Sequence, residues 1–460
     1  MKKLLKVSLG TIFLCLFSLP AQAETLEELK SMMQQMKTEY EGRINTLEKK
    51  IDALETQQKK DSVRVEQLNN QQSEKVAAIE SKIEEKSLNV EYVGRYKAPE
   101  GNGGLLVRNP FGFGSVSVGG YADLEYGDFE NDGAYFSSHR WIINVGAQLH
   151  DRIGFNSELE IEEGGPNSAN EDGEIKVEQA YMDYKIANWV NVRAGAVLVP
   201  FGRYNLYHDS DLQDLTARPI MARDIVPTTW TEAGGGIFGQ MNPDLESLKN
   251  LSLSYEVYAV NGLDQGFDDT GLQEARPSLK IDNNDDKAIV GRLAISPTLN
   301  QELGFSGYWG EYDPLGNAIQ GSGVDWHSTV GSFELISEYA YFDVEESAAG
   351  SSDVADFFQG AYAQLNYHFW FDWLNQTFLG KGFENPQFTL AGRYDWALIH
   401  DDGDADNSEN NRETRYTLGF NYRPIENFIY KFEYQWNQAN NETLERGDSN
   451  GFLSSVAIGF

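Results

Sequence analysis

The sequence predicts an all-β transmembrane barrel of about sixteen antiparallel strands, preceded by an α-helical coiled-coil stalk. Apolar and polar residues alternate with a period of two from about residue 115 onward, which is the pattern of strands with two different faces. Heptad spacing of apolar residues occupies the segment 24–88. No apolar run of 18 or more residues follows the first 20 residues, which excludes membrane-spanning helices.

The chain is strongly acidic. Its 460 residues include 71 acidic and 37 basic side chains, for a formal charge of −34. This balance disfavours a nucleic-acid partner, because nucleic-acid binding needs a basic face to neutralise phosphates. The single cysteine, Cys15, lies in a segment that we expect to be removed on export. The mature chain then has no disulfide, no thiolate nucleophile and no cysteine metal ligand.

Residues 1–23 have the composition of a secretory signal peptide. A basic start with three lysines precedes a short apolar core at 7–19, and Ala21-Gln22-Ala23 supplies the small-x-small pattern of a cleavage site. The apolar stretch is too short for a membrane anchor. We therefore predict cleavage after Ala23.

Residues 24–90 are predicted to form a coiled coil in the periplasm. The segment contains no proline and one glycine, and its apolar residues form two lines that match the a/d seam of a heptad. A lone amphipathic helix is the alternative, but the narrow seam with charged flanks favours self-association. The first line consists of Leu26, Met33, Tyr40, Leu47, Leu54 and Leu68, and the second of Ile44, Ile51 and Val65.

Residues 115–460 are predicted to form the barrel, and residues 91–114 a linker before it. Alternation is clearest in 428–437, where five aromatic residues alternate with Ile429, Lys431, Glu433, Gln435 and Asn437. An apolar outer face for lipid and a polar inner face for water is typical of a membrane barrel. A soluble β-sandwich is the alternative, but it requires no alternation of long and short connections.

Sixteen strand starts are expected, near residues 115, 137, 152, 175, 190, 231, 250, 287, 301, 324, 334, 355, 387, 412, 427 and 451. Long connections are expected near 127–136, 163–174, 200–230, 263–286, 313–323, 345–354, 400–411 and 441–450. Outer-membrane barrels have an even number of strands, short periplasmic turns and long external loops. Both ends of the barrel chain then lie in the periplasm with the coiled coil, and the expected location is the cell outer membrane.

The last strand ends in an aromatic residue, Phe460. A terminal aromatic on an alternating strand resembles the assembly signal of outer-membrane barrels. We therefore expect Phe460 to be recognised by the barrel assembly machinery, and lipid and lipopolysaccharide to surround the barrel.

The longest loop, 200–230, is the predicted pore constriction. About sixteen strands enclose an aqueous lumen, whereas eight would be filled by side chains. Loop 200–230 follows the fifth strand and holds the position of the third external loop, which in sixteen-stranded porins folds into the lumen and narrows it. A solvated external cap is the alternative. The constriction residues are expected to be Arg203, Asp209, Asp211, Asp214, Arg218, Arg223 and Asp224.

Segment 195–240 contains a strand that ends in Pro200-Phe201-Gly202, a long loop with Arg223-Asp224, and a glycine-rich strand at 234–239. These features resemble the phosphate-selective porin O and P family, in which a coiled coil before the barrel is also seen. The resemblance implies a homotrimeric sixteen-stranded channel for passive diffusion of small hydrophilic solutes.

The expected lumen wall carries both signs of charge. A phosphate channel needs rows of cationic side chains, and only eight lysines occur after residue 90, so phosphate or another anion is the alternative substrate. The eight long connections hold 30 acidic and 6 basic residues, a net charge of −24 at the external mouth, which predicts weak cation preference at low salt. The wall residues are Arg140, Glu158, Glu160, Asp183, Arg193, Arg292, Arg393 and Arg415.

One acidic loop matches a calcium-binding spacing through Asp402, Asp404, Asp406 and Glu413. Asn407 replaces the glycine that such loops require, so we interpret this segment as a solvated acidic surface. No other pattern indicates a metal, a cofactor or a catalytic residue. The second functional interpretation is a structural tether, whose barrel anchors a coiled coil that reaches the peptidoglycan, and the third is an adhesin.

Overall fold

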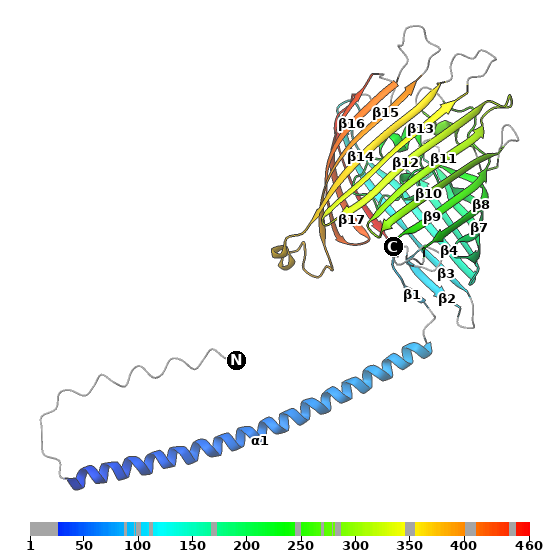
Figure 1. Cartoon of the computed structure of the whole chain (residues 1–460). Helices are drawn as coiled ribbons and strands as arrows, with labels where there is room; N and C mark the ends of the chain where they lie inside the picture. Colours follow the sequence, from blue (N-terminus) through cyan, green and yellow to red (C-terminus); the bar gives the residue numbers. More distant parts are fainter. Residues whose placement is uncertain are drawn as a thin grey trace. The chain divides into compact units, whose positions relative to one another are not determined.

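The structure is a computed structural model that describes residues 26–86, 90–95, 97, 103–109, 114–166, 173–243, 250–267, 271–277, 279–280, 287–345, 355–400, 411–440 and 448–460. The chain divides into two compact units, Met1–Ser87 and Leu88–Phe460. The first contains the helix α1, and the second contains an antiparallel sheet of eighteen strands (Figure 1).

Helix α1 spans Leu26–Lys86, a run of 61 residues. No proline interrupts this helix and Gly42 is its one glycine, so the segment contains no strong helix breaker. The apolar residues of the heptad seam from Met33 to Leu68 are exposed: Met33, Leu47 and Leu54 have 63%, 58% and 68% of their surface accessible. Within the described part of the chain, no helix is both long enough and apolar enough to cross a membrane.

Sixteen strands, β3 to β18, form a closed barrel, as the sequence predicts. Each strand pairs with its neighbour in sequence, and β18 closes the barrel by pairing with β3, from Gly451 opposite Phe129 to Gly459 opposite Tyr121. Closure leaves no free sheet edge around the barrel. The strands are Ser115–Phe129 (β3), Gly133–His150 (β4), Ile153–Glu162 (β5), Ile175–Ala187 (β6), Val190–Leu198 (β7), Thr231–Met241 (β8), Ser252–Val260 (β9), Ala288–Thr298 (β10), Gln301–Glu311 (β11), Ala318–Val330 (β12), Phe333–Val344 (β13), Phe357–Phe369 (β14), Gln387–His400 (β15), Asn411–Ile425 (β16), Phe428–Ala439 (β17) and Gly451–Gly459 (β18).

Two of the expected long connections are shorter than the alternation suggests. β4 begins at Gly133 rather than near 137, and β12 begins at Ala318 rather than near 324. In the first hairpin the backbone pairing continues to Phe129 opposite Gly133. Ladder hydrogen bonds join backbone groups and need no apolar side chain, so a strand extends beyond the end of its hydrophobic alternation.

The segment 91–114, which we expected to be a linker, contributes to the sheet. Two short strands, β1 (Val90–Tyr92) and β2 (Leu105–Arg108), pair with each other, and β2 also pairs with the first residues of β3. Leu106 of β2 is fully buried. This segment is therefore attached to the barrel rather than free of it.

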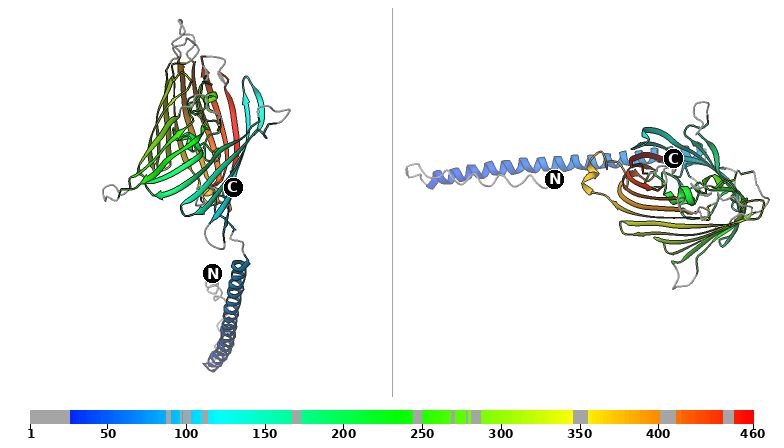
Figure 2. Two further views of the ribbon diagram at one scale, coloured as in Figure 1. Left: turned by 90° about the vertical axis from the view of Figure 1, so that its right-hand side faces the viewer. Right: turned by 90° about the horizontal axis from the view of Figure 1, so that it is seen from above.

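An apolar core occupies part of the barrel interior. The view from above in Figure 2 shows helical turns of loop 200–230 inside the ring of strands. Apolar side chains of this loop pack against inward-facing apolar side chains of the wall and are fully or nearly fully buried. The cluster includes Val199, Phe201, Ile220, Met221, Ile225 and Trp230 from the loop and its ends, and Tyr258, Tyr308, Phe342 and Phe358 from the wall.

This core differs from the sequence-based prediction, in which the inner face of the barrel was polar throughout. A signal is present in β13, where Tyr339, Ala340, Tyr341 and Phe342 are consecutive and leave no polar face. In a membrane barrel, a strand that is apolar on both faces turns one face to lipid and has its inner face covered by other apolar side chains. Such a run predicts a covered inner wall rather than a wetted one.

Candidate pore constriction

Loop 200–230 connects β7 with β8 and lies inside the barrel. It contains a short 3-10 helix, η1 (Tyr204–Leu206), and one turn of π-helix, η2 (Met221–Ile225). Its backbone and side chains bond to inward-facing residues of β6, β11 and β13 to β18. The loop is therefore fixed to the wall along much of its length, and it does not form an external cap.

Glu338 of β13 fixes the start of the loop. Its carboxylate accepts the backbone N–H of Arg203 at 3.0 Å and of Tyr204 at 2.6 Å. Gly202 has a φ of +71°, and a Cβ there would lie 2.5 Å from Glu338 Oε2, so the Pro-Phe-Gly sequence ends in the residue that this approach requires. The guanidinium of Arg203 pairs with Glu302 of β11 at 3.1 Å.

Arg95, between β1 and β2, binds two carboxylates of the loop. Its Nη2 lies 2.8 Å from Asp209 Oδ2 and its Nε lies 2.6 Å from Asp211 Oδ2. The guanidinium also stacks over the ring of Tyr121, 4.5 Å from the ring centroid, and the side chain is 4% exposed. Arg95 is not among the predicted site residues, because a single arginine in an expected linker belongs to no sequence pattern.

The middle of the loop bonds to β14, β16 and β17. Asp214 accepts the side-chain amides of Asn366 at 2.8 Å and of Asn421 at 3.0 Å. Glu433 accepts the backbone N–H of Thr216 at 2.6 Å. These partners lie on three different strands, so they fix both the position and the orientation of this part of the loop.

Two buried arginines of the wall hold the next turn. Arg393 Nη1 donates to the carbonyl of Ala217 at 2.9 Å and its Nη2 donates to the carbonyl of Arg218 at 3.2 Å. Arg415 donates to the same Arg218 carbonyl at 3.4 Å. The Arg218 side chain in turn donates to the carbonyl of Thr228, within the loop.

The charges near the end of the loop pair locally. Arg223 Nε lies 2.5 Å from Asp224 Oδ1, and its Nη2 lies 2.6 Å from Glu413 Oε2 of β16. The seven predicted constriction residues therefore all lie in the barrel interior. Each forms a hydrogen bond or ion pair with the wall, with Arg95 or within the loop.

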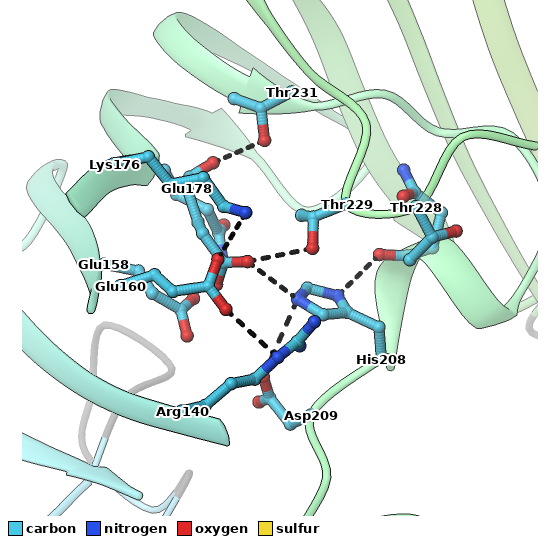
Figure 3. A network of polar contacts seen from close by, with 12 residues as sticks. Arg140, Glu158, Glu160, Lys176, Glu178, His208, Asp209, Thr228, Thr229 and Thr231 are labelled. Atoms are coloured by element: carbon cyan, nitrogen blue, oxygen red, sulfur yellow. Dashed lines mark hydrogen bonds and ion pairs between the residues drawn. The ribbon is translucent and has the colours of Figure 1, made fainter. Parts of the chain in front are cut away.

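A network of buried charges joins the loop to β4, β5 and β6 (Figure 3). Glu160 on β5 lies between two cations, with Arg140 Nε at 3.2 Å and Lys176 Nζ at 2.8 Å. Glu160 is fully buried and Arg140 is 3% exposed. Charges taken out of water at this depth require such partners.

Glu178 of β6 binds two residues of the loop within this network. His208 Nε2 lies 3.5 Å from Glu178 Oε1, and the hydroxyl of Thr229 donates to the same oxygen at 2.8 Å. A bulge opposite Glu158 and Leu159 places Glu178 inside the barrel, since it shifts the side-chain alternation of β6 by one residue. Strict period two does not reveal such a shift, so Glu178 is not among the predicted site residues.

Several residues of loop 200–230 have shifted pKa values, among them His208 and Asp211. Burial alone would lower the pKa of His208, but the Glu178 and Asp209 carboxylates outweigh it and raise this pKa to about 9. Burial raises the pKa of Asp211 to about 7, against the opposing effect of Arg95. At neutral pH the His208 imidazole is therefore a buried cation that faces the Glu178 carboxylate.

The eight residues predicted for the lumen wall lie at inward-facing positions, but most are covered. Ion pairs occupy several of them: Arg193 Nε lies 2.8 Å from Asp183 Oδ1, and Arg292 Nη2 lies 2.6 Å from Asp325 Oδ1. Asp183 and Arg193 remain partly exposed. The residues at most 5% exposed, which do not face open water as we expected, are Arg140, Glu158, Glu160, Arg393 and Arg415.

The calcium-loop candidate is only partly described. Asp402, Asp404 and Asp406 lie outside the described residues. Glu413 is 2% exposed, and its carboxylate binds Arg223 and lies 3.5 Å from Arg415 Nη2. Glu413 thus faces the barrel interior, because β16 begins at Asn411 and places the Glu413 side chain on the inner face.

Comparisons with known proteins match both the sequence and the fold. A family model described as phosphate-selective porin O and P matches residues 116–324 and 316–459. An uncharacterized protein of Aquifex aeolicus is 33% identical over 190 residues, which is 41% of each of the two chains.

Solved outer-membrane channels have a similar fold at low sequence identity. The outer membrane channel DcaP of Acinetobacter baumannii is 12% identical, with a TM-score of 0.50 over 77% of this chain and 99% of that one. An anion-selective porin from Comamonas acidovorans is 11% identical, with a TM-score of 0.48 over 76% of this chain and 100% of that one.

Proposed function

We propose that this chain, which belongs to the phosphate-selective porin O and P family and forms an outer-membrane channel, is a passive, non-enzymatic porin. It carries small hydrophilic solutes and ions through a lumen that loop 200–230 narrows. The observation that carries the proposal is the attachment of this loop to the inner wall on many sides. A loop fixed in this way narrows the lumen at a constant place.

The passage runs beside the loop, where charged inner side chains remain partly exposed. Asp183, Arg193, Glu256 and Glu302 have exposed side-chain fractions of 15%, 19%, 32% and 21%. They lie on β6, β7, β9 and β11, on the opposite side of the barrel interior from the buried contacts with β16 and β17. Polar groups of both signs along a wetted path suit hydrated small solutes.

We infer that the channel prefers cations weakly. The arginines that could attract anions already bind acceptors: Arg193 binds Asp183, and Arg393 binds Asp395 and two loop carbonyls. With loop 200–230 inside the barrel, the other seven long connections hold 26 acidic and 3 basic residues, because 4 of the 30 acidic and 3 of the 6 basic residues belong to that loop. Their net charge of −23 attracts cations to the external mouth at low salt.

Reversal potentials of the purified protein in planar bilayers test both parts of the proposal. We expect open channels with a modest cation preference at low potassium chloride that fades at high salt. Strong anion preference at both salts would contradict the cation assignment and favour phosphate-type transport, and in that case R218Q and R223Q together should abolish the preference. The absence of any open channel would contradict the porin itself and favour the structural tether.

We also propose that α1 assembles three copies into a periplasmic coiled coil, and so stabilises a homotrimer. The exposed heptad seam supports this, because apolar side chains at a and d positions gain free energy when they pack between helices. At 1.5 Å per residue, 61 helical residues extend about 92 Å. A stalk of this length also suits a contact with peptidoglycan.

A further inference from the structure

We propose that Asp214, Glu334 and His368 form a binding site for a divalent transition-metal ion such as Zn²⁺, which would tie loop 200–230 to the barrel wall. Asp214 belongs to the loop, Glu334 to β13 and His368 to β14. One oxygen of each carboxylate and one ring nitrogen of the histidine lie within 4.8 Å of one another. Imidazole and carboxylate together are the ligand types that Zn²⁺ and similar ions accept.

Each of the three donors is held by a separate partner. The Nδ1 of His368 lies 2.9 Å from Thr389 Oγ1, an arrangement that leaves Nε2 for the ion when Nδ1 carries the proton. His327 binds Glu334 Oε1 at 2.8 Å, so Glu334 Oε2 faces His368. Oriented ligands of this kind distinguish a metal site from a chance meeting of charged side chains.

The loop carboxylate is oriented in the same way. Asn421 donates to Asp214 Oδ1 at 3.0 Å, so Oδ2 turns toward the other two donors. The amide nitrogen of Asn366 lies between the carboxylates, 2.8 Å from Asp214 Oδ2 and 3.0 Å from Glu334 Oε2. An incoming cation would take over this bridging role, and the Asn366 side chain would rotate away.

The charge and the access also suit a cation. Two carboxylates face the site, while Arg423 lies 3.9 Å from Asp214 on its far oxygen, Oδ1. Glu334 and His368 are each 19% exposed, so they are not sealed from water. His368 lines a cavity of about 870 Å³ that also contacts Ser332 and Trp370, at the end of the barrel that carries the short turns. Of the three donors, His368 is the one that lines this cavity, so an ion that enters from that end meets His368 first.

A second cluster of the same composition serves as a matched control. Asp123, Glu125 and His139 also bring donor atoms within 4.8 Å. There, one ring nitrogen, His139 Nδ1, contacts both carboxylates at 3.2 Å, and Asp123 also accepts the backbone N–H of Arg140 at 2.8 Å. Because one histidine nitrogen already contacts both carboxylates there, and no residue that the structure describes orients the other ring nitrogen as Thr389 orients His368, we expect this cluster to bind the ion much more weakly.

Zn²⁺ titration of the purified full-length protein tests the proposal, in the presence of millimolar Mg²⁺ to fill sites made of oxygen ligands alone. We expect one tight Zn²⁺ per protomer, and Co²⁺ at the same site should give visible absorption typical of nitrogen and oxygen ligands. H368Q and D214N should each weaken binding by more than about tenfold, and T389A by about tenfold, while H139Q should bind as the unaltered protein does.

Two results would overturn the site. One is a protein that binds no stoichiometric Zn²⁺, and the other is binding that H139Q removes and H368Q or D214N leaves unchanged. The difference in gel mobility between unboiled and boiled samples checks that each variant is folded. T389A removes only one hydroxyl, so it still tests the site if a variant of a metal ligand does not fold. Metal binding is measured without channel activity, so its failure would leave the proposed porin function untouched.

Discussion

Arg95 Nη2 lies 2.8 Å from Asp209 Oδ2, and this ion pair joins the segment before the barrel to the loop inside it. The same guanidinium contacts Asp211 at 2.6 Å. Arg95 is therefore the cation that two buried loop carboxylates share. Arg95 thereby takes part in the constriction, although it precedes the first barrel strand, β3, in the sequence.

Replacing Arg95 with glutamine should loosen the loop. Loss of one partner from a buried ion pair costs about 3 kcal/mol or more, because the remaining charges stay buried without compensation. We expect R95Q channels to show increased current noise and frequent brief closures in single-channel recordings. The matched control is R108Q, since Arg108 pairs with Glu91 at 2.7 Å but both side chains are about half exposed. Equal noise in both variants would contradict a role for Arg95 in holding the loop.

The attachment of the loop should weaken at alkaline pH. The pKa of His208 is raised to about 9, so its contact with Glu178 stabilises the loop fully below about pH 6.5 and is lost as the pH rises through 9. The pKa of Asp211 is raised to about 7, so ionisation of this carboxyl also disfavours the buried loop as the pH rises from about 4 through 7. Both effects predict noisier channels at pH 9 than at pH 6.

The His208 contribution can be separated by substitution. The shift from an ordinary histidine pKa corresponds to about 3 kcal/mol of pH-dependent stabilisation. H208Q should therefore be noisy already at pH 6 and should change less between pH 6.5 and 9 than the unaltered protein. H150Q is the control, because His150 is exposed at the end of β4. An unchanged alkaline transition in H208Q would mean that another group controls it.

The helix seam should control trimer stability. L47D combined with L54D places two charges at seam positions that are exposed in the single chain, and these charges would be buried in a coiled coil. We expect the variant barrel to fold and the native mass to fall from trimer to monomer. K49D, on the opposite face of the heptad, should remain trimeric. A trimer that survives L47D and L54D together would place the subunit contacts in the barrel alone.

Phe460 should be needed for assembly in the membrane. Its backbone exchanges two hydrogen bonds with Gly120, at 2.8 and 3.0 Å, where β18 meets β3, and its side chain is 41% exposed. We expect F460D to reach the periplasm but to accumulate poorly in outer-membrane fractions. F378D is the control, because Phe378 is 86% exposed in the connection between β14 and β15. Normal membrane levels of F460D would exclude a role for the terminal aromatic residue in assembly.

The sequence predicted the barrel well because period two is a local property of each strand. Most of the sixteen expected starts lie within two residues of the observed ones. The predictions for β4 and β12 were late by four and six residues, since polar strand ends pair through their backbones. The two strands before β3 are three and four residues long and contain too few residues to reveal a period.

The site was harder to predict than the strands. The loop position and its charged residues follow from length and composition, but their partners do not. Arg95 and Asp209 are 114 residues apart, and Thr216 and Glu433 are 217 apart. Pairing at such separations depends on how the loop folds back inside the closed barrel. The residues next to each of these side chains in the sequence do not indicate which partner it binds.

The sequence alone determined an alternating chain of sixteen strands, a heptad helix before it and a long loop in the third external position, because these depend on spacing along the chain. Only the tertiary structure decided which inward-facing residues meet water. Arg140 and Arg193 both face the barrel interior, yet Arg140, in the charge network that joins the loop to β4, β5 and β6, is 3% exposed, whereas Arg193, near the start of β7, is 19% exposed. The difference comes from where loop 200–230 packs, and packing depends on contacts between residues that are distant in sequence.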